Sequence, residues 1–97
     1  MMCHISHVYT SGASLYFTVV SDQGDDPLPH WDKAKHAASD AIADAGGTIS
    51  HHHGVGTDHR DWYEREIGPL GAAVLRAVKD RLDPAGILNP GVLVPGE

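Results

Sequence analysis

Apolar and polar positions near the start of the chain follow the short alternation that is typical of β-strands. Residues 4–9 and 15–20 each form such a segment, and residues 10–13 between them have the composition of a turn. In the second segment, side chains alternate between two sides that are both largely apolar. We therefore expect two strands, the second of them central in its sheet rather than at an edge.

After a polar, acidic connection at residues 23–29, the apolar positions take up helical spacing. Gly46 and Gly47 are expected to stop the first helix, because glycine adopts the left-handed cap without penalty. At the end of the last helix, Pro84 pushes the preceding residue out of the helical region. In chain order, the pattern predicts a helix over residues 30–45, a third strand over 48–50, a short helix over 60–67 broken by Gly68-Pro69, and a longer helix over 70–82.

This order of elements predicts an α+β fold. It matches half of a ferredoxin-like cap domain, an antiparallel sheet with helices on one face, followed by C-terminal helices. Ile, Leu, Val and Phe make up only 21 of the 97 residues, close to the roughly 20 % level below which a charged chain struggles to fold alone. We expect one domain over residues 1–97 that leans on a partner, on a larger protein or on a second copy of itself.

Charge and composition exclude several classes of function. The net charge of −6 removes the attraction on which non-specific nucleic-acid binding depends, so no nucleic-acid partner is expected. No apolar stretch approaches the ~20 residues of a membrane span, and the first residues lack the basic and then apolar order of a signal peptide. A single cysteine, Cys3, cannot form an internal disulfide, which favours a cytoplasmic protein.

The densest chemical signal is a run of three histidines, His51, His52 and His53, followed by Gly54-Val55-Gly56. Histidine can act as acid, base, ligand or phosphate partner near neutral pH, and glycine lets a ligand approach the backbone closely. A metal site would pair His51 and His53 with His59 or Asp58, but the usual zinc spacings are absent. A substrate site is favoured over a metal site, and backbone hydrogen bonding by one or two of the histidines stays open as a further alternative.

Four segments resemble the C-terminal domain of FAD-linked oxidases, in the vanillyl-alcohol oxidase superfamily. The branch that the chain resembles most is that of alkyldihydroxyacetonephosphate synthase and its bacterial relatives, whose hallmark is three histidines before Gly-Val-Gly. The resemblance covers nearly the whole chain in the right order. The segments are His4-Ile5-Ser6-His7-Val8-Tyr9, Ser14-Leu15-Tyr16-Phe17-Thr18, residues 46–56, and residues 82–91, which end in Asn89-Pro90-Gly91.

The resemblance implies a cofactor, a chemistry and roles for particular residues. FAD would be bound mainly by an FAD-binding domain or subunit that this chain lacks, so the chain alone is expected to be inactive. Family synthases exchange an acyl group for a fatty alcohol, a transferase reaction of ether-lipid synthesis, on a small substrate that is lipid-like or phosphate-bearing. By position, Tyr16 matches the catalytic acid/base, and His51, His52 and His53 match the active-site histidines.

Five further residues are expected to contact substrate or cofactor: His7, Gly54, Gly56, Arg60 and Asn89. Arg60 would pair with an anionic group of the substrate or with the flavin phosphates. Related 2-hydroxyacid dehydrogenases hold a metal, but Tyr16 and His52 depart from their ligand pattern, so no metal is expected. An FAD-dependent 2-hydroxyacid dehydrogenase and a non-catalytic, histidine-rich metal-binding or dimerisation module remain the alternative functions.

Overall fold

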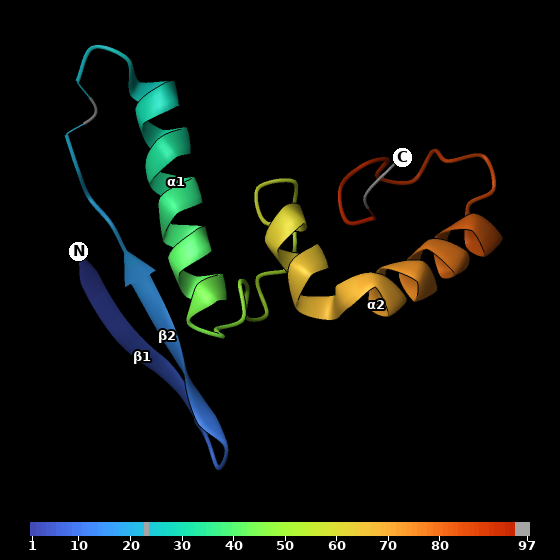
Figure 1. Cartoon of the computed structure of the whole chain (residues 1–97), viewed down its shortest axis with the longest axis horizontal. Helices are drawn as coiled ribbons and strands as arrows, with labels where there is room; N and C mark the ends of the chain where they lie inside the picture. The colour runs from blue at the N-terminus through green and yellow to red at the C-terminus, as the bar shows by residue number, and fades with distance from the viewer. Residues whose placement is uncertain (23, 95–97) are drawn as a thin grey trace. The chain divides into compact units, whose positions relative to one another are not determined.

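The computed structural model describes residues 1–22 and 24–94. Its elements follow in the order β1 (Met2–Tyr9), β2 (Gly12–Thr18), α1 (Pro27–Asp44) and α2 (Arg60–Leu82) (Figure 1). The chain divides into two compact units, residues 1–34 and residues 35–97. The predicted α+β class is confirmed as a two-stranded antiparallel hairpin followed by two helices. Neither helix, over the residues described, combines the length and the apolar character that a membrane crossing requires.

The first unit contains the hairpin. β2 pairs with β1 only, among the residues described, so the prediction that it is a central strand is wrong for this chain. The prediction rested on apolar side chains on both sides of the strand. These side chains lie at the surface instead: Leu15 is 53 % exposed and Phe17 is 44 % exposed. A two-stranded sheet cannot bury both of its faces by itself.

A bulge in β1 determines which side chains of the hairpin share a face. His4 pairs with Tyr16, but the register shifts between Ile5 and His7, and His7 then pairs with Ser14. Directly paired residues lie on the same face, and so do residues two apart on a strand. His4 and His7 therefore lie on one face together with Tyr16, although a regular strand would send them to opposite sides.

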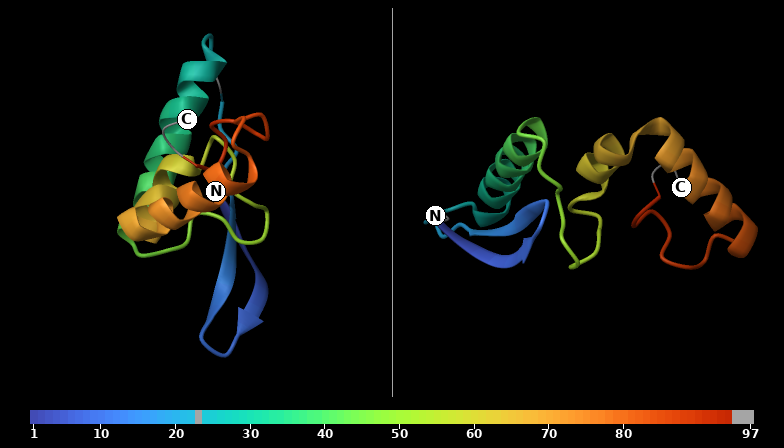
Figure 2. Two further views of the ribbon diagram at one scale, coloured as in Figure 1. Left: turned by 90° about the vertical axis from the view of Figure 1, so that its right-hand side faces the viewer. Right: turned by 90° about the horizontal axis from the view of Figure 1, so that it is seen from below.

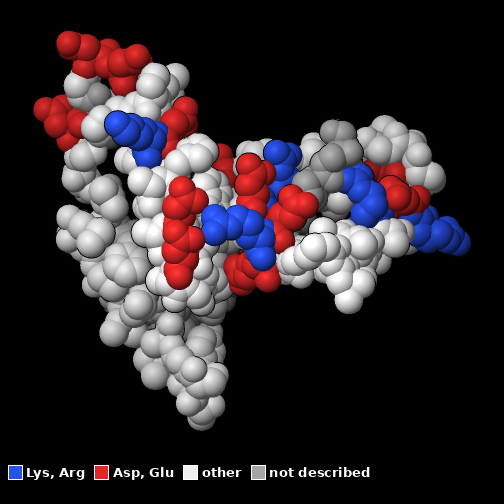
Figure 3. Space-filling model, in the orientation of Figure 1, with Lys and Arg blue, Asp and Glu red and all other residues white. Residues whose placement is uncertain are grey.

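The opposite face of the hairpin is apolar and carries Cys3, Ile5, Val8, Leu15 and Phe17. No Lys, Arg, Asp or Glu occurs before Asp22, so the surface of the hairpin is free of formal charge and appears white in Figure 3. The hairpin thus has one face of hydroxyl and imidazole groups and one hydrophobic face.

The second unit contains the end of α1, the loop that carries the histidines, and α2. Helix α1 begins three residues earlier than predicted, at Pro27, where the fixed φ of proline suits a first helical position. It ends at the predicted glycines: Gly46 has φ +77°, its N–H donates to Ala43, and the N–H of Gly47 donates to the carbonyl of Ile42 at 2.9 Å. This Schellman motif turns the chain sharply into residues 48–59.

No strand forms at residues 48–50, so the predicted third strand is wrong. Thr48 and Ile49 form hydrogen bonds with the carboxylate of Glu66 on α2 instead of with a neighbouring strand. The two helices predicted over 60–67 and 70–82 are confirmed as two segments of α2. Gly68 lies between them with φ +69° and ψ 178°, Pro69 follows it, and the helix bends there (Figure 2).

Buried side chains are few among the described residues. Trp62 is 7 % exposed and Val94 is 8 % exposed, while the apolar stripe of α2 lies open, with Leu70 at 78 % and Val74 at 55 %. Trp31 on α1 is 45 % exposed. Much of the apolar surface of the described residues is therefore exposed to solvent, which is what we expect of a domain that packs against a partner.

Candidate functional site

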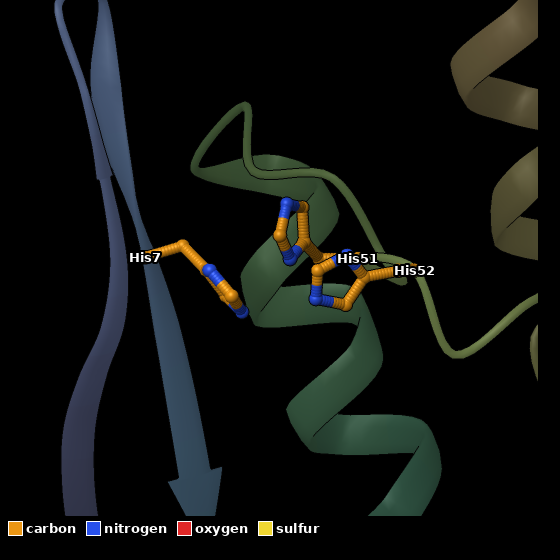
Figure 4. Close-up of side chains that lie close together, drawn as sticks. All are labelled: His7, His51 and His52. Carbon is orange, nitrogen blue, oxygen red and sulfur yellow. The ribbon is translucent and has the colours of Figure 1, made fainter.

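The loop after α1 holds the three histidines in a closed turn. The N–H of His53 donates to the carbonyl of His51 at 2.7 Å, and His52 between them has φ +39°, a left-handed conformation that non-glycine residues rarely adopt. The rings of His51 and His52 lie 4.1 Å apart between centroids, and their side chains are drawn as sticks in Figure 4. Strained backbone of this kind persists only where the surroundings hold it, and it is concentrated at functional sites.

Contacts on both sides of the histidines hold this turn. Ahead of it, the Glu66 carboxylate accepts hydrogen bonds from the Thr48 hydroxyl at 2.6 Å and from the Ile49 N–H at 3.1 Å. Across it, the Ser50 hydroxyl donates to the carbonyl of Gly54 at 2.8 Å. Gly54 has φ +80° and open space around its Cα, so its conformation, not crowding, requires glycine there. Gly56 also has open space.

His51 is half-buried, whereas His52 and His53 are exposed. Their imidazoles can therefore meet a ligand from solvent, and the ring centroids of His52 and His53 lie 6.3 Å apart with nearly parallel planes. Among the described residues, His51 and His53 do not gather with His59 or Asp58 around a point that one ion could occupy. The metal site considered from the spacing is therefore not assembled.

His59 ends the loop at the start of α2 and contacts Lys35 on α1. The Lys35 Nζ and the His59 Nε2 lie 2.7 Å apart, a distance at which the ammonium donates to a neutral imidazole. Burial of the ring lowers the pKa of His59 most, Lys35 lowers it further, and Asp58 opposes both. The base of the histidine loop thus favours a neutral imidazole.

Arg60 and the turn at Asn89, two of the residues expected to bind substrate or cofactor, lie close together in the structure. The Arg60 Nη1 donates to the carbonyl of Gly91 at 2.5 Å, and its Nε lies 3.4 Å from Asp61. Asn89 has φ +46° in the turn that leads to Gly91. The guanidinium thereby fastens the C-terminal segment to the start of α2, a role that the sequence did not predict.

The remaining predicted residues, Tyr16 and His7, lie on the polar face of the hairpin in the first unit. Tyr16 is 49 % exposed, and the His7 ring stacks on that of Tyr9 with 6.3 Å between centroids. His4, which a regular strand would point away from His7, lies directly opposite Tyr16. Sequence reasoning also missed Glu66 and Ser50, since neither spacing nor periodicity reveals a hydrogen bond across a loop.

Comparison with known proteins identifies the family. The model of the FAD linked oxidases, C-terminal domain, matches residues 1–93. The chain belongs to this family. Alkyldihydroxyacetonephosphate synthase of Dictyostelium discoideum is 41 % identical over 93 residues, which cover 95 % of this chain and 15 % of the relative.

Two other relatives cover the chain equally well. The alkyldihydroxyacetonephosphate synthase of Trypanosoma brucei brucei is 37 % identical over 96 % of this chain and 15 % of its own length. An uncharacterized FAD-linked oxidoreductase of Escherichia coli, YgcU, is 33 % identical over 97 % of this chain and 20 % of its own length. The chain thus spans a fifth or less of these relatives, and no solved structure matches it.

Proposed function

We propose that this chain is the substrate-binding C-terminal part of an FAD-dependent enzyme of the alkyldihydroxyacetonephosphate synthase type. The single observation that carries the proposal is the similarity to two synthases over nearly the whole chain. A histidine turn that is held in a strained conformation supports it. The strained turn at His52 supports residues 51–53 as the site of chemistry in this proposal.

The described residues fit the substrate side of a flavin site. The polar face of the hairpin offers a phenol and imidazoles that can form hydrogen bonds and exchange protons. The hairpin carries no Lys or Arg that could neutralise the diphosphate of FAD, so that part of the cofactor is expected to bind to another domain. Bound FAD would supply the redox-active ring against which the substrate is placed.

In the assembled enzyme, Tyr16 is the acid/base at the reacting carbon of the substrate: its phenol hydroxyl gives a proton to that carbon, or its phenolate takes one from it. A role of this kind needs a side chain that is accessible and within hydrogen-bond reach, and Tyr16 is half exposed. His51, His52 and His53 bind the polar or phosphate end of the substrate, because imidazole can donate a hydrogen bond and carry a positive charge near neutral pH. Gly54 and Gly56 leave the backbone beside them open to a ligand.

A chimaera tests this function. The chain replaces the matching 93-residue segment of the Dictyostelium discoideum synthase, and formation of alkyldihydroxyacetonephosphate is measured together with bound FAD. We expect the chimaera to retain flavin and synthase activity. A folded, flavin-loaded chimaera without synthase activity would overturn the assignment to the synthase type, and reduction of its flavin by 2-hydroxyacids would then identify the dehydrogenase alternative.

The 97-residue chain itself is titrated with FAD and followed by flavin absorbance and co-elution on a sizing column. We expect no stable binding, because the chain spans only 15–20 % of its flavoprotein relatives. Stoichiometric binding would contradict the assignment of FAD to another domain. Zinc that binds stoichiometrically and is required for folding would instead favour a metal-binding module.

A further inference from the structure

Glu66 connects α2 to the segment that enters the histidine run. Its two carboxylate oxygens accept separate hydrogen bonds, Oε1 from the Thr48 hydroxyl at 2.6 Å and Oε2 from the Ile49 N–H at 3.1 Å. Two bonds to neighbouring residues fix both the position and the direction of the backbone, which a single bond would leave free to pivot. The chain is thus fixed two residues before His51.

The turn that follows has a conformation that the sequence does not favour by itself. His52 has a positive φ of 39° without being glycine, and the hydrogen bond from His53 to His51 closes the turn. The Ser50 hydroxyl fastens the far side at Gly54. A residue in this region of φ and ψ stays there only when contacts around it hold it. Glu66 and Ser50 form side-chain hydrogen bonds on the two sides of the run.

The surroundings of Glu66 indicate a local role. Its side chain, like that of Thr48, is exposed, and exposed charged contacts contribute little to the overall stability of a fold. The adjacent Glu64 is equally exposed on the same helix and has no hydrogen bond to the loop among the contacts that the structure describes. Removing the Glu66 carboxylate should therefore change the conformation of the loop while it changes the stability of the surrounding unit only slightly.

We propose that Glu66, acting through Thr48 and Ile49, is a positioning residue that sets the orientation of the His51–His53 imidazoles. The consequence for catalysis rests on the function proposed above, whereas the effect on the imidazoles does not. A carboxylate on α2 is suited to this task because the N–H and the hydroxyl that it holds are both donors, and a charged acceptor makes such bonds strong.

The first test uses the complete 97-residue chain with ¹³C-labelled imidazoles, assigned by single His→Gln changes. We expect Glu66→Ala and Thr48→Val to shift the ring resonances of His51, His52 and His53, while those of His4 and His30 stay in place. Thr48→Ser keeps the hydroxyl and should restore the wild-type positions, and Glu64→Ala is the matched control. Unchanged resonances of the three histidines in Glu66→Ala, in a chain with wild-type circular dichroism, would overturn the proposal.

Should Glu66→Ala prevent folding, Thr48→Val still tests the proposal, because it removes one of the two bonds and keeps the shape of the side chain. The second test places the same variants in the flavin-loaded chimaera. Misplacement of catalytic groups by about 1 Å lowers rates by up to about 100-fold. We therefore expect kcat to fall by about 10- to 100-fold in Glu66→Ala and to stay near the wild-type value in Thr48→Ser.

The two tests separate the inference from the proposed function. A chimaera that is inactive with wild-type Glu66 overturns the synthase function, but the imidazole shifts in the chain still decide the positioning role. An active chimaera in which Glu66→Ala neither shifts the imidazoles nor lowers kcat overturns the inference alone. Shifted imidazoles with unchanged kcat would overturn its catalytic consequence.

Discussion

The indole N–H of Trp62 on α2 donates a hydrogen bond to Oδ1 of Asp40 on α1, with 2.9 Å between the two atoms. The same carboxylate lies 3.3 Å from Arg65, whose second terminal nitrogen lies 3.0 Å from Asp44. The His36 ring meets the edge of the indole, with 5.1 Å between centroids. These contacts fix the start of α2 and with it the base of the histidine loop.

Replacing Trp62 with Phe should lower the free energy of unfolding of this unit by about 1–2 kcal/mol, because it removes the indole N–H that donates a hydrogen bond to Asp40. Urea unfolding followed by far-UV circular dichroism measures the change. Trp31→Phe is the control and should change stability by less than about 0.5 kcal/mol, since Trp31 is 45 % exposed. Equal effects of the two substitutions would contradict the role of the Trp62 hydrogen bond.

Elements whose formation depends on local sequence were predicted well. The hairpin, the glycine stop of α1, the break at Gly68-Pro69 and the end of α2 before Pro84 all follow from backbone preferences that act within a few residues. The predicted third strand does not form, because Thr48 and Ile49 form hydrogen bonds with Glu66 instead of with a neighbouring strand. Local sequence patterns do not reveal a partner that is so distant along the chain. The exposure of the apolar side chains of β2 and α2 likewise depends on contacts between distant parts of a fold, which local patterns do not reveal.

The candidate site was predicted in part. The histidine run and its glycines stand out by composition, and the structure places them in a closed turn. The face shared by His4 and Tyr16 could not be foreseen, because it depends on a bulge at one position of β1, and a shift of one residue moves every following side chain to the other face. The assignment of Tyr16 as acid/base rests on the family resemblance and remains a prediction.

That role is tested by Tyr16→Phe in the flavin-loaded chimaera. Loss of a general acid/base costs about 10²- to 10⁴-fold in rate, so turnover should nearly vanish while the amount of bound FAD stays the same. Tyr9→Phe, on the same face of the hairpin, is the matched control and should keep most of the activity. Normal turnover in Tyr16→Phe would exclude Tyr16 as the acid/base.

The contact between His59 and Lys35 predicts a pH dependence of stability. The folded state lowers the pKa of His59 from its ordinary value of 6.5, chiefly through burial and then through Lys35. The unfolded chain therefore binds more protons just below pH 6.5, and the contribution of His59 to stability is present above that value and is lost as pH falls through the lower, folded pKa. Unfolding should become easier as the solution is acidified through this range.

Comparison with a His59→Gln variant isolates this contribution from the other seven histidines. Urea midpoints of the two chains, measured from pH 8 down to about pH 5, should differ in slope, with the flatter curve for His59→Gln. Lys35→Met should reduce the slope as well, because it removes one of the two causes of the lowered pKa. Parallel curves for all three chains would show that His59 does not titrate as described.

Asp83 organises the segment that follows α2. Its carboxylate accepts hydrogen bonds from Lys79, from the N–H of Ile87 at 3.1 Å and from the N–H of Leu88 at 2.9 Å. The bond from Lys79 lowers the pKa of Asp83 most, followed by the bond from Leu88. Its contribution is thus complete above the ordinary value of 3.8 and is lost as pH falls through the lower, folded pKa.

Asp83→Ala should accelerate amide hydrogen exchange at Ile87 and Leu88 at neutral pH, because both N–H groups lose their acceptor. Asp80→Ala, in the last turn of α2, is the control and should leave these two amides as slow as in the unchanged chain. Exchange rates that match in all three chains would mean that the carboxylate does not hold the turn.

The bend of α2 depends on Gly68, whose φ of +69° and ψ of 178° lie in a region that only glycine occupies readily. A Cβ at this position would meet no atom within 4 Å, so the effect of Gly68→Ala comes from the backbone alone, at a cost of about 1–3 kcal/mol. Gly56→Ala is the matched control, because Gly56 has equally open space and no positive φ. Urea unfolding should show a clear loss for Gly68→Ala and little change for Gly56→Ala, whereas equal stability of the two variants would mean that α2 straightens through this position without penalty.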